Sequence, residues 1–380
     1  MKIVIAPDSF KESLSALEAA NAIERGVKSI FPNAKYKRMP MADGGEGTVQ
    51  SLVDATNGRV IERTVTGPLG EPVQAFFGLM GDGKTAVIEM AAASGLHLVP
   101  PEKRNPLHTS TRGTGELIAA AMDTGVKHII IGIGGSATND AGAGMIQALG
   151  GKLLDKTGTE IGPGGGSLAE LSSIDMSNLD SRLRGVHIEV ACDVDNPLTG
   201  PRGASAIFGP QKGATPEMVG LLDRNLSHFA DVVEHELGKA FREIEGAGAA
   251  GGIGGSLLAF LNADLKRGID IVLEAVNFED EVKDADLVIT GEGRIDSQTI
   301  FGKTPIGVAK VAKKHGIPVM GLAGSLSDDS HIVHEHGIDA LFSIVPGVIS
   351  LPDAFKEAEV YMERTARNVA AIIRMNKNMK

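Results

Sequence analysis

Short apolar runs alternate with amphipathic segments at both ends of the chain. The run KIVIA at 2–6 predicts a strand, and the segment 13–30 carries apolar residues at the spacing of a helix. A second strand at 35–41 and a helix at 48–55 continue this pattern. Further apolar strands separated by helices are predicted near the C-terminus, before a final amphipathic helix, at 286–293, 318–325 and 340–347.

The middle of the chain follows other patterns. From about residue 60 to residue 90, apolar and polar residues alternate with a period of two between turn sequences, which is typical of antiparallel hairpins. From 111 to about 278, helices, strands and glycine-rich loops alternate. A strand is predicted within 186–195 and a long helix around 216–245.

The two N-terminal and three C-terminal strands predict one parallel sheet of an α/β fold, because strands separated by helices pair in parallel. They would form a discontinuous domain of residues 1–62 and 282–380. Residues 63–281 would be an inserted α/β domain with the glycine-rich loops and a mixed or antiparallel sheet. Ligands bind at the carboxyl ends of parallel strands, and these ends read PDSFK, MADGGEG and TGEGRID. An active site in the cleft between the domains is therefore expected.

Composition narrows the class of protein. The 380 residues are 42% hydrophobic and 22% charged, as in globular proteins with a sizeable core. No apolar run approaches the roughly 18 residues of a membrane span, and the strand-like N-terminus does not read as a signal peptide. A single cysteine fits a reducing compartment, so the cytoplasm is the predicted location. The net charge of −11 and the absence of tryptophan argue against a nucleic-acid partner.

A glycine-rich loop follows the apolar run that begins at His128. The segment HIIIGIGGSATNDAGAG, 128–144, passes from apolar residues to glycines and then to Ser136, Thr138, Asn139 and Asp140. Glycines let the backbone approach an oxyanion, and free N–H groups at a helix start point toward it. The segment therefore predicts a phosphate-binding loop.

Two motif matches suggest other nucleotide sites. GLMGDGKT at 78–85 fits the Walker A pattern, but the residues after Lys84 resemble a strand, and Asp82-Gly83 is a hairpin-turn dipeptide. A turn is therefore favoured. GIGGSA at 132–137 fits a dinucleotide fingerprint, with Asp155 about the right distance further on, so a nicotinamide site stays open.

Three further features are weaker. HIVHEH at 331–336 lacks the spacing of a zinc motif, so histidines on a solvated helix end are favoured over metal ligands. Cys192 closes an apolar strand and is interpreted as a small buried hydrophobic residue rather than a nucleophile. GAGAAGG at 246–252 matches a glycine fingerprint but follows a helix.

Acidic residues gather at strand ends and in glycine-rich loops. A single one would be an ordinary helix cap or turn residue. Several of them, with basic residues in similar contexts, indicate phosphoryl transfer, which needs carboxylates for Mg²⁺, cations for the transferred group and a base for the hydroxyl proton. The residues concerned are Asp8, Asp43, Asp193, Asp195 and Asp296, with Lys11, Arg112, Arg202, Arg294 and Lys303.

Seven motifs in order resemble one family over nearly the whole chain, the type 1 bacterial glycerate kinases. The resemblance implies ATP-dependent phosphorylation of D-glycerate, at the 2-hydroxyl in this branch, on a flavodoxin-like domain joined to a second α/β domain. The 3-hydroxyl remains an alternative. The motifs are APDSFKES (6–13), MADGGEGT (41–48), TRGTGELI (111–118), GIGGSATNDAGAG (132–144), ACDVDNPLTGP (191–201), FGPQKGA (208–214) and TGEGRIDSQT (290–299).

Individual roles are assigned by chemistry. Asp193 is the first choice for the general base and Asp296 the second, and Lys11 would neutralise the transferred phosphoryl group. Ser9 and Arg112 would hold the glycerate carboxylate, although an ion pair at a helix end explains Arg112 equally well. The remaining assignments are Asp43 and Asp195 for Mg²⁺, and Gly134, Gly135, Ser136, Thr138 and Asn139 for the phosphates of ATP.

Two functions of other classes compete with the kinase. A hydroxy-acid sensor would bind glycerate without turning over ATP, but it would gain nothing from so many carboxylates around an anion. A nicotinamide oxidoreductase would use the GIGGSA loop. The expected partners are D-glycerate and ATP, with neither nucleic acid nor membrane, and formation of a homodimer stays open.

Overall fold

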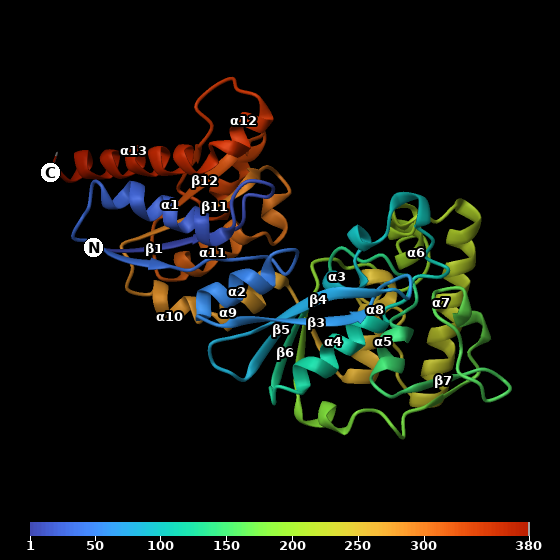
Figure 1. Cartoon of the computed structure of the whole chain (residues 1–380). Coiled ribbons are helices and arrows are strands. Elements are labelled where there is room, and N and C mark those ends of the chain that lie inside the picture. Colours follow the sequence, from blue (N-terminus) through green and yellow to red (C-terminus); the bar gives the residue numbers. More distant parts are fainter. Residues whose placement is uncertain (379–380) are drawn as a thin grey trace. The chain divides into compact units, whose positions relative to one another are not determined.

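The computed structural model describes residues 1–378 as two compact units, shown in Figure 1. Unit 1 comprises Met1–Asp43, Gln50–Asn57 and Ile269–Lys380, and unit 2 comprises Gly44–Val49 and Gly58–Gly268. The chain crosses between the units after residues 43, 49, 57 and 268. Residues 379 and 380, the end of the predicted segment 282–380, lie outside the described residues.

Unit 1 contains the predicted five-stranded parallel sheet, in the order β13-β12-β11-β1-β2. Numbered along the chain within this unit, the order is 2-1-3-4-5, the flavodoxin-like arrangement, and its switch point lies between β1 and β11. The prediction of a flavodoxin-like sheet is confirmed. The strands are β1 (Lys2–Pro7), β2 (Lys35–Arg38), β11 (Leu287–Ile295), β12 (Val319–Leu326) and β13 (Ala340–Ser343).

Helices α1 (Ala16–Lys28) and α13 (Ala358–Asn378) pack against each other and against this sheet. Helix α1 starts with a capping box in which Ser15 and Glu18 exchange hydrogen bonds. The two backbones approach closely at Gly26, where a Cβ atom would lie 2.2 Å from the Glu363 carbonyl oxygen. The other helices of this part of the chain are α2 (Thr48–Thr56), α9 (Gly268–Ala275), α10 (Phe278–Val282), α11 (Thr304–Lys314) and α12 (Leu351–Lys356).

Unit 2 contains a six-stranded mixed sheet in the order β10-β9-β6-β5-β4-β3. The three strands that come first along the chain, β3, β4 and β5, pair antiparallel, as the alternation of period two predicted. Strands β5, β6, β9 and β10 pair in parallel. The strands are β3 (Arg59–Thr66), β4 (Pro72–Leu79), β5 (Thr85–Glu89), β6 (His128–Gly132), β9 (His187–Ala191) and β10 (Asp264–Lys266). A separate hairpin pairs β7 (Lys152–Leu154) with β8 (Ser173–Asp175).

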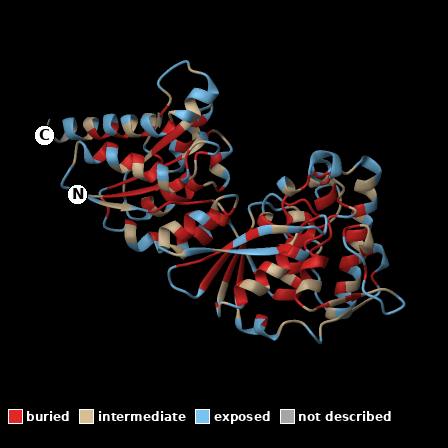
Figure 2. Cartoon of the chain, in the orientation of Figure 1, coloured by how far each residue is buried: buried red, intermediate tan, exposed pale blue. Residues whose placement is uncertain are grey.

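The helices of unit 2 bury one large apolar core together with this sheet, and the central strands appear buried in Figure 2. Val87, Ile88, Ile129, Ile130 and Ile131 are all at most 1% exposed, as expected for strands covered on both faces. The helices are α3 (Ala91–Ser94), α4 (Arg112–Met122), α5 (Ala143–Ala148), α6 (Ala204–Phe208), α7 (Pro216–Leu237) and α8 (Ala249–Leu261).

The long helix predicted around 216–245 ends earlier than its apolar pattern indicated. Helix α7 stops at Leu237, and Gly238 follows in the left-handed conformation (φ 66°) that glycine adopts readily at helix ends. The continuing apolar pattern has another cause, because Phe241 is buried and its ring meets that of Phe229 edge-on at 6.5 Å. Among the described residues, no helix is both long and apolar enough to cross a membrane.

Candidate active site

The predicted phosphate loop of unit 2 follows β6 and ends at α5. Gly134 and Gly135 are exposed, and Gly135 has a φ of 73°, which glycine tolerates best. A Cβ atom at Gly134 would find one heavy atom within 4 Å, the Gly45 Cα at 3.9 Å. The DGGEG loop therefore lies beside this turn, and the glycine backbone is open to a ligand.

The polar side chains of the loop face inward instead. Ser136, Thr138, Asn139 and Asp140 are at most 5% exposed. The ammonium group of Lys212 donates hydrogen bonds to the Thr138 carbonyl oxygen at 2.6 Å and to the Ser136 hydroxyl at 3.2 Å. These hydroxyl groups thus belong to a buried network, and the exposed backbone of the two glycines is the part available to an anion. Whether any of these five predicted residues binds ATP stays a prediction.

Lys212 is a residue to which the sequence assigned no role, although it lies in the motif FGPQKGA. Its side chain is among the largest that are fully buried. Burial lowers the pKa of Lys212 to about 7, against the opposing effect of the Asp140 carboxylate. A buried amine bonded to the backbone of a loop fixes the shape of that loop.

Asp140 is the second anchor of the network. Its carboxylate accepts hydrogen bonds from the Thr111 backbone and hydroxyl, both at 2.9 Å, and from the Gly142 and Gly144 backbone at 3.2 and 3.4 Å. Complete burial raises its pKa, and the donors oppose that rise. Asp140 therefore ties the loop to the segment that starts α4.

Glu89 orders the start of α2. It ends β5, is 9% exposed and accepts a hydrogen bond from the Val49 backbone at 2.9 Å. Burial raises the pKa of Glu89, and hydrogen bonds from the Val49, Gly47 and Thr48 backbone oppose that rise. A carboxylate at a helix start also suits the helix dipole.

In unit 1 a carboxylate pair lies at the switch point of the parallel sheet. Pro7 and Gly291 are register partners on β1 and β11, and the Asp8 backbone donates to the Gly291 carbonyl oxygen at 2.8 Å. Asp8 follows the end of β1, and Glu292 lies within β11, directly after the last residue that pairs with β1. This edge is where ligands of such sheets bind.

Both residues are partly buried, and both carboxyl groups accept hydrogen bonds. The Thr304 hydroxyl donates to Asp8 at 2.5 Å, and the Ser9 backbone donates to it at 2.6 Å. Burial, together with the nearby Asp43 carboxylate, raises the pKa of Asp8 to about 6. Its titration range therefore moves toward neutral pH.

The pKa of Glu292 lies at least as far above its ordinary value as that of Asp8 does. It accepts hydrogen bonds from the Thr299 hydroxyl at 2.9 Å and from the Lys303 ammonium group at 3.4 Å. Burial raises the pKa of Glu292 to about 7, although Lys303 opposes the rise. A carboxyl group with a pKa near neutrality can accept a proton efficiently at physiological pH. The signal for it was present in the sequence, since Glu292 lies in the motif TGEGRIDSQT.

The raised pKa of Glu292 has a consequence for stability. Between its ordinary pKa of 4.5 and about 7 the folded state holds a proton that the unfolded state has lost, so stability falls as the pH rises through this window. Glu292→Gln removes this loss, on the order of 3 kcal/mol. The difference in melting temperature between the variant and the original protein is expected to increase from pH 5 to pH 8. A constant difference would contradict the burial argument.

The other predicted residues of unit 1 lie close to this pair along the chain. The Ser9 hydroxyl donates to Asp8 at 3.3 Å, and Lys11 is exposed, with its backbone nitrogen 3.7 Å from where a Cβ atom at Gly293 would lie. Asp296 accepts a hydrogen bond from the Gln298 backbone at 2.9 Å and pairs with Arg294 at 3.2 Å. That carboxylate is already part of a turn.

In unit 2, the predicted acidic residues follow β9. Asp193 is exposed and accepts a hydrogen bond from the Gly268 backbone at 3.1 Å. Asp195 pairs with Arg202 at 2.8 Å, both side chains being 66% exposed. Exposed pairs of this kind contribute little to stability.

Arg112, the residue of unit 2 that is predicted to bind the glycerate carboxylate, lies at the start of α4. Arg112 pairs with Glu116 one turn further on, at 3.3 Å, which is the ion pair that the sequence offered as its alternative. Its binding of glycerate stays a prediction.

The Walker A match is a turn, as its context predicted. The Asp82 carboxylate accepts from the backbone of Lys84 and Thr85 at 2.8 and 3.0 Å, between β4 and β5. Cys192 donates to the Val194 carbonyl oxygen at 3.3 Å, and burial raises its pKa, so it is not an activated thiolate. His334 bonds to the Ile338 carbonyl oxygen at 2.7 Å in a short helical turn, Ser330–His336.

Unit 1 has a carboxylate pair and a lysine at the switch point of its parallel sheet, and unit 2 has a glycine loop after β6 of its mixed sheet. Groups of these kinds are used in phosphoryl transfer. The glycerate kinase family model matches residues 3–374. The chain is 74% identical to a glycerate kinase of Bacillus subtilis, over 100% of this chain and 99% of that protein. It is 61% identical to the glycerate 2-kinase of Escherichia coli K12, over 98% of each chain.

A solved structure supports the same family. The crystal structure of a candidate glycerate kinase 2 from Salmonella typhimurium LT2 superposes with a TM-score of 0.93 at 57% identity, covering 100% of this chain and 99% of that one. The chain belongs to the glycerate kinase family. It is a kinase, and the sensor and the nicotinamide oxidoreductase are the weaker explanations of its sequence.

Proposed function

We propose that this protein transfers the γ-phosphoryl group of ATP to the 2-hydroxyl group of D-glycerate, giving 2-phosphoglycerate and ADP. The observation that carries the chemistry is the partly buried pair Asp8 and Glu292 with Lys303 at the switch point of the unit 1 sheet. The choice of the 2-hydroxyl rests on the 61% identity to a relative named for it. The cytoplasm stays the predicted location, supported by the single cysteine.

In this proposal Glu292 is the general base. Its carboxylate accepts the proton of the 2-hydroxyl, the oxygen forms a bond to the γ-phosphorus, and the bond from that phosphorus to the bridging oxygen breaks to release ADP. Lys303 and the predicted Lys11 supply positive charge. Glu292 is proposed in place of Asp193 and Asp296 because its partly buried carboxylate lies beside Lys303, whereas Asp193 is exposed and Asp296 is bound by Arg294 and the Gln298 backbone.

The remaining predicted residues keep their proposed roles, each within its own unit. In unit 2, the backbone of Gly134 and Gly135 would bind phosphate oxygens, since it is exposed, whereas the Ser136, Thr138 and Asn139 side chains shape the loop from within. Ser9 of unit 1 is proposed to bind the glycerate carboxylate. Arg112 of unit 2 is proposed for the same role, after exchanging its bond to Glu116.

Asp8 and Asp43 fit a Mg²⁺ ion better than Asp195 does. The two carboxylates repel each other enough to contribute to the raised pKa of Asp8, and a bound cation would relieve that repulsion. The Asp195 carboxylate is paired with Arg202 instead. When bound, Mg²⁺ would neutralise charge on the phosphate oxygens.

Asp43→Asn is expected to raise the Mg²⁺ concentration for half-maximal activity by about 10-fold or more, because one carboxylate ligand becomes neutral. Asp195→Asn, the matched variant, is expected to shift it by less than about 2-fold. Steady-state rates over a Mg²⁺ titration at saturating ATP measure both. A larger shift in Asp195→Asn than in Asp43→Asn would identify Asp195 as the Mg²⁺ ligand instead.

The function is tested by phosphorus NMR of the products formed from D-glycerate and Mg-ATP. A 2-phosphoglycerate signal appearing with ADP supports the proposal. A 3-phosphoglycerate signal would keep the family and overturn the choice of hydroxyl. Neither product above a control without protein would overturn the activity itself.

A further inference from the structure

A second polar cluster lies in unit 2, at the amino-terminal ends of the parallel strands. His128 and His187 are register partners at the starts of β6 and β9, and Glu189 follows two residues after His187, so all three share one face of the sheet. On β10, Asp264 is the register partner of Glu189. Strand β6 reaches the glycine loop only after Gly132, about 13 Å from His128 at 3.3 Å per residue. The cluster is therefore separate from the site described above.

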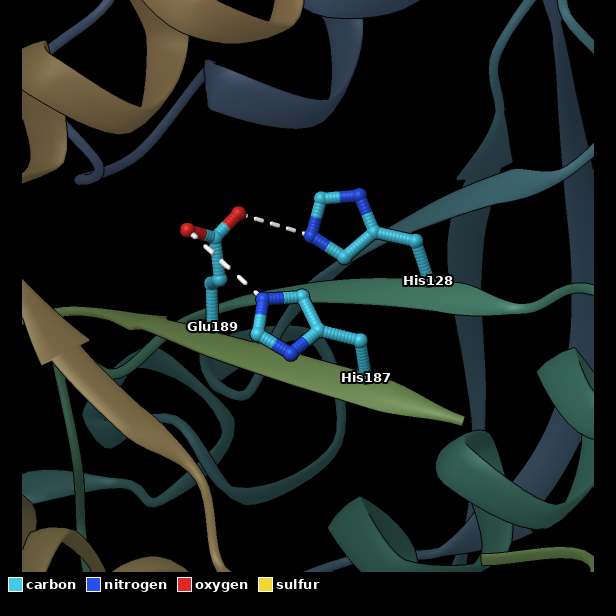
Figure 3. Close-up of side chains that lie close together, drawn as sticks. All are labelled: His128, His187 and Glu189. Carbon is cyan, nitrogen blue, oxygen red and sulfur yellow. Dashed lines mark hydrogen bonds and ion pairs between the residues drawn. The ribbon is translucent and has the colours of Figure 1, made fainter. Parts of the chain in front are cut away.

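The side chains converge on one carboxylate. Figure 3 shows both imidazole rings directing a nitrogen toward Glu189. The His128 Nε2 atom lies 2.7 Å from Glu189 Oε2, and the His187 Nε2 atom lies 3.9 Å from Oε1 and 3.8 Å from the Asp264 carboxylate. One ligand atom from each of His128, His187 and Glu189 lies within 4.8 Å of the others.

These separations are close to what a metal ion requires. A tetrahedral zinc ion with bonds of about 2.0–2.1 Å sets its ligands about 3.4 Å apart, which small side-chain rotations here would achieve. Glu189 is 7% exposed at its side chain, whereas His187 is 54% exposed. The cluster thus combines a fixed inner ligand with an outer ligand that solvent can reach.

Lys266 competes with a metal ion for the Glu189 carboxylate. Its ammonium group lies 2.5 Å from Glu189 Oε1. The side chain of Lys266 is 39% exposed, so it has solvent to move into when a metal ion takes its place at Glu189.

We propose that His128, His187 and Glu189, with Asp264 completing the set, bind a divalent transition-metal ion of the Zn²⁺ class. Two imidazole nitrogens and two carboxylates suit zinc, cobalt or nickel, whereas Mg²⁺ prefers oxygen ligands alone and retains its waters. The Mg²⁺ of the phosphoryl transfer is therefore a poor occupant. Binding joins three neighbouring strands at their amino ends and stabilises the folded state.

The test is a calorimetric titration of the metal-free, full-length protein with Zn²⁺, in the presence of excess Mg²⁺. One equivalent is expected to bind, and His128→Gln or His187→Gln is expected to weaken binding about 10-fold or more. His235→Gln on α7, an exposed histidine in the same unit, is the matched control and leaves binding unchanged. Lys266→Gln is expected to tighten binding, because it removes the competitor.

Cobalt supplies a second readout, since Co²⁺ held by nitrogen and oxygen ligands absorbs visible light. Circular dichroism confirms that each variant is folded, and the exposed His187 gives a variant with little structural cost. Zn²⁺ binding that persists in the variant lacking both histidines would overturn the proposal, as would full displacement by Mg²⁺. Absence of binding even in Lys266→Gln would show that the cluster is an ion-pair network only.

Discussion

Glu292→Gln is expected to lower kcat for glycerate phosphorylation by about 100-fold or more, with little change in the KM for ATP. The amide keeps the size of the side chain and an acceptor for the Thr299 hydroxyl, but it cannot take the substrate proton. In the original protein, kcat/KM is expected to fall below pH 7, because protonation of a base with a pKa of about 7 removes it. This acidic limb disappears in the variant. Steady-state kinetics from pH 5.5 to 9 measure both effects.

Asp193→Asn is the matched comparison, because Asp193 is the first choice of the sequence for the same role. Its exposed carboxylate predicts a smaller loss of kcat, less than about 10-fold. A 100-fold loss in Asp193→Asn with a near-normal Glu292→Gln would return the base to Asp193. The same measurement of kcat on Asp296→Asn tests Asp296, the second choice of the sequence for the general base.

Asp140→Ala is expected to lower the free energy of unfolding of unit 2 by about 3–5 kcal/mol. The substitution leaves the Thr111 backbone and hydroxyl without their acceptor and leaves Lys212 without a nearby negative charge, all of them buried. Urea unfolding followed by circular dichroism measures the loss. The chain has no tryptophan for fluorescence.

Asp155→Ala is the control for the loss of a turn carboxylate. Asp155 also accepts hydrogen bonds from backbone groups, those of Thr157 and Thr159, but on the surface of the β7 region. Its loss is expected to destabilise the protein much less than Asp140→Ala, since water replaces the carboxylate. Equal losses in the two variants would contradict a special role for the buried network around the glycine loop.

The parallel sheet of unit 1 could be predicted because most of its strands are apolar runs bounded by glycine and polar residues, β2 (KYKR) being the exception. Burial on both faces leaves little ambiguity in a run such as 286–293, observed as β11. The end of α7 could not be placed in this way. Phe241 keeps the helical spacing of apolar residues, yet it packs from a loop, and the backbone conformation of Gly238 decides where the helix stops.

The candidate site was predictable in its glycine loops and less so in its carboxylates. The conformation of a glycine loop depends mostly on residues adjacent in sequence, so the turn at Gly134 and Gly135 could be predicted from seventeen consecutive residues. The raised pKa of Glu292 depends on burial and on the charge of Asp8, 284 residues away along the chain. Similarly, Lys212 meets Thr138 across 74 residues. Neither environment follows from the residues adjacent in sequence.

The discontinuity of unit 1 dictates the order in which the chain can fold during synthesis. Strand β1 ends at Pro7, and β11, its neighbour on one side, starts at Leu287, 280 residues later (287 − 7). At about 5–20 residues per second, β1 waits roughly 14–56 seconds during synthesis for this neighbour. All of unit 2 is synthesised within that interval. Its core can therefore form while the edge of β1 that later pairs with β11 is still unpaired.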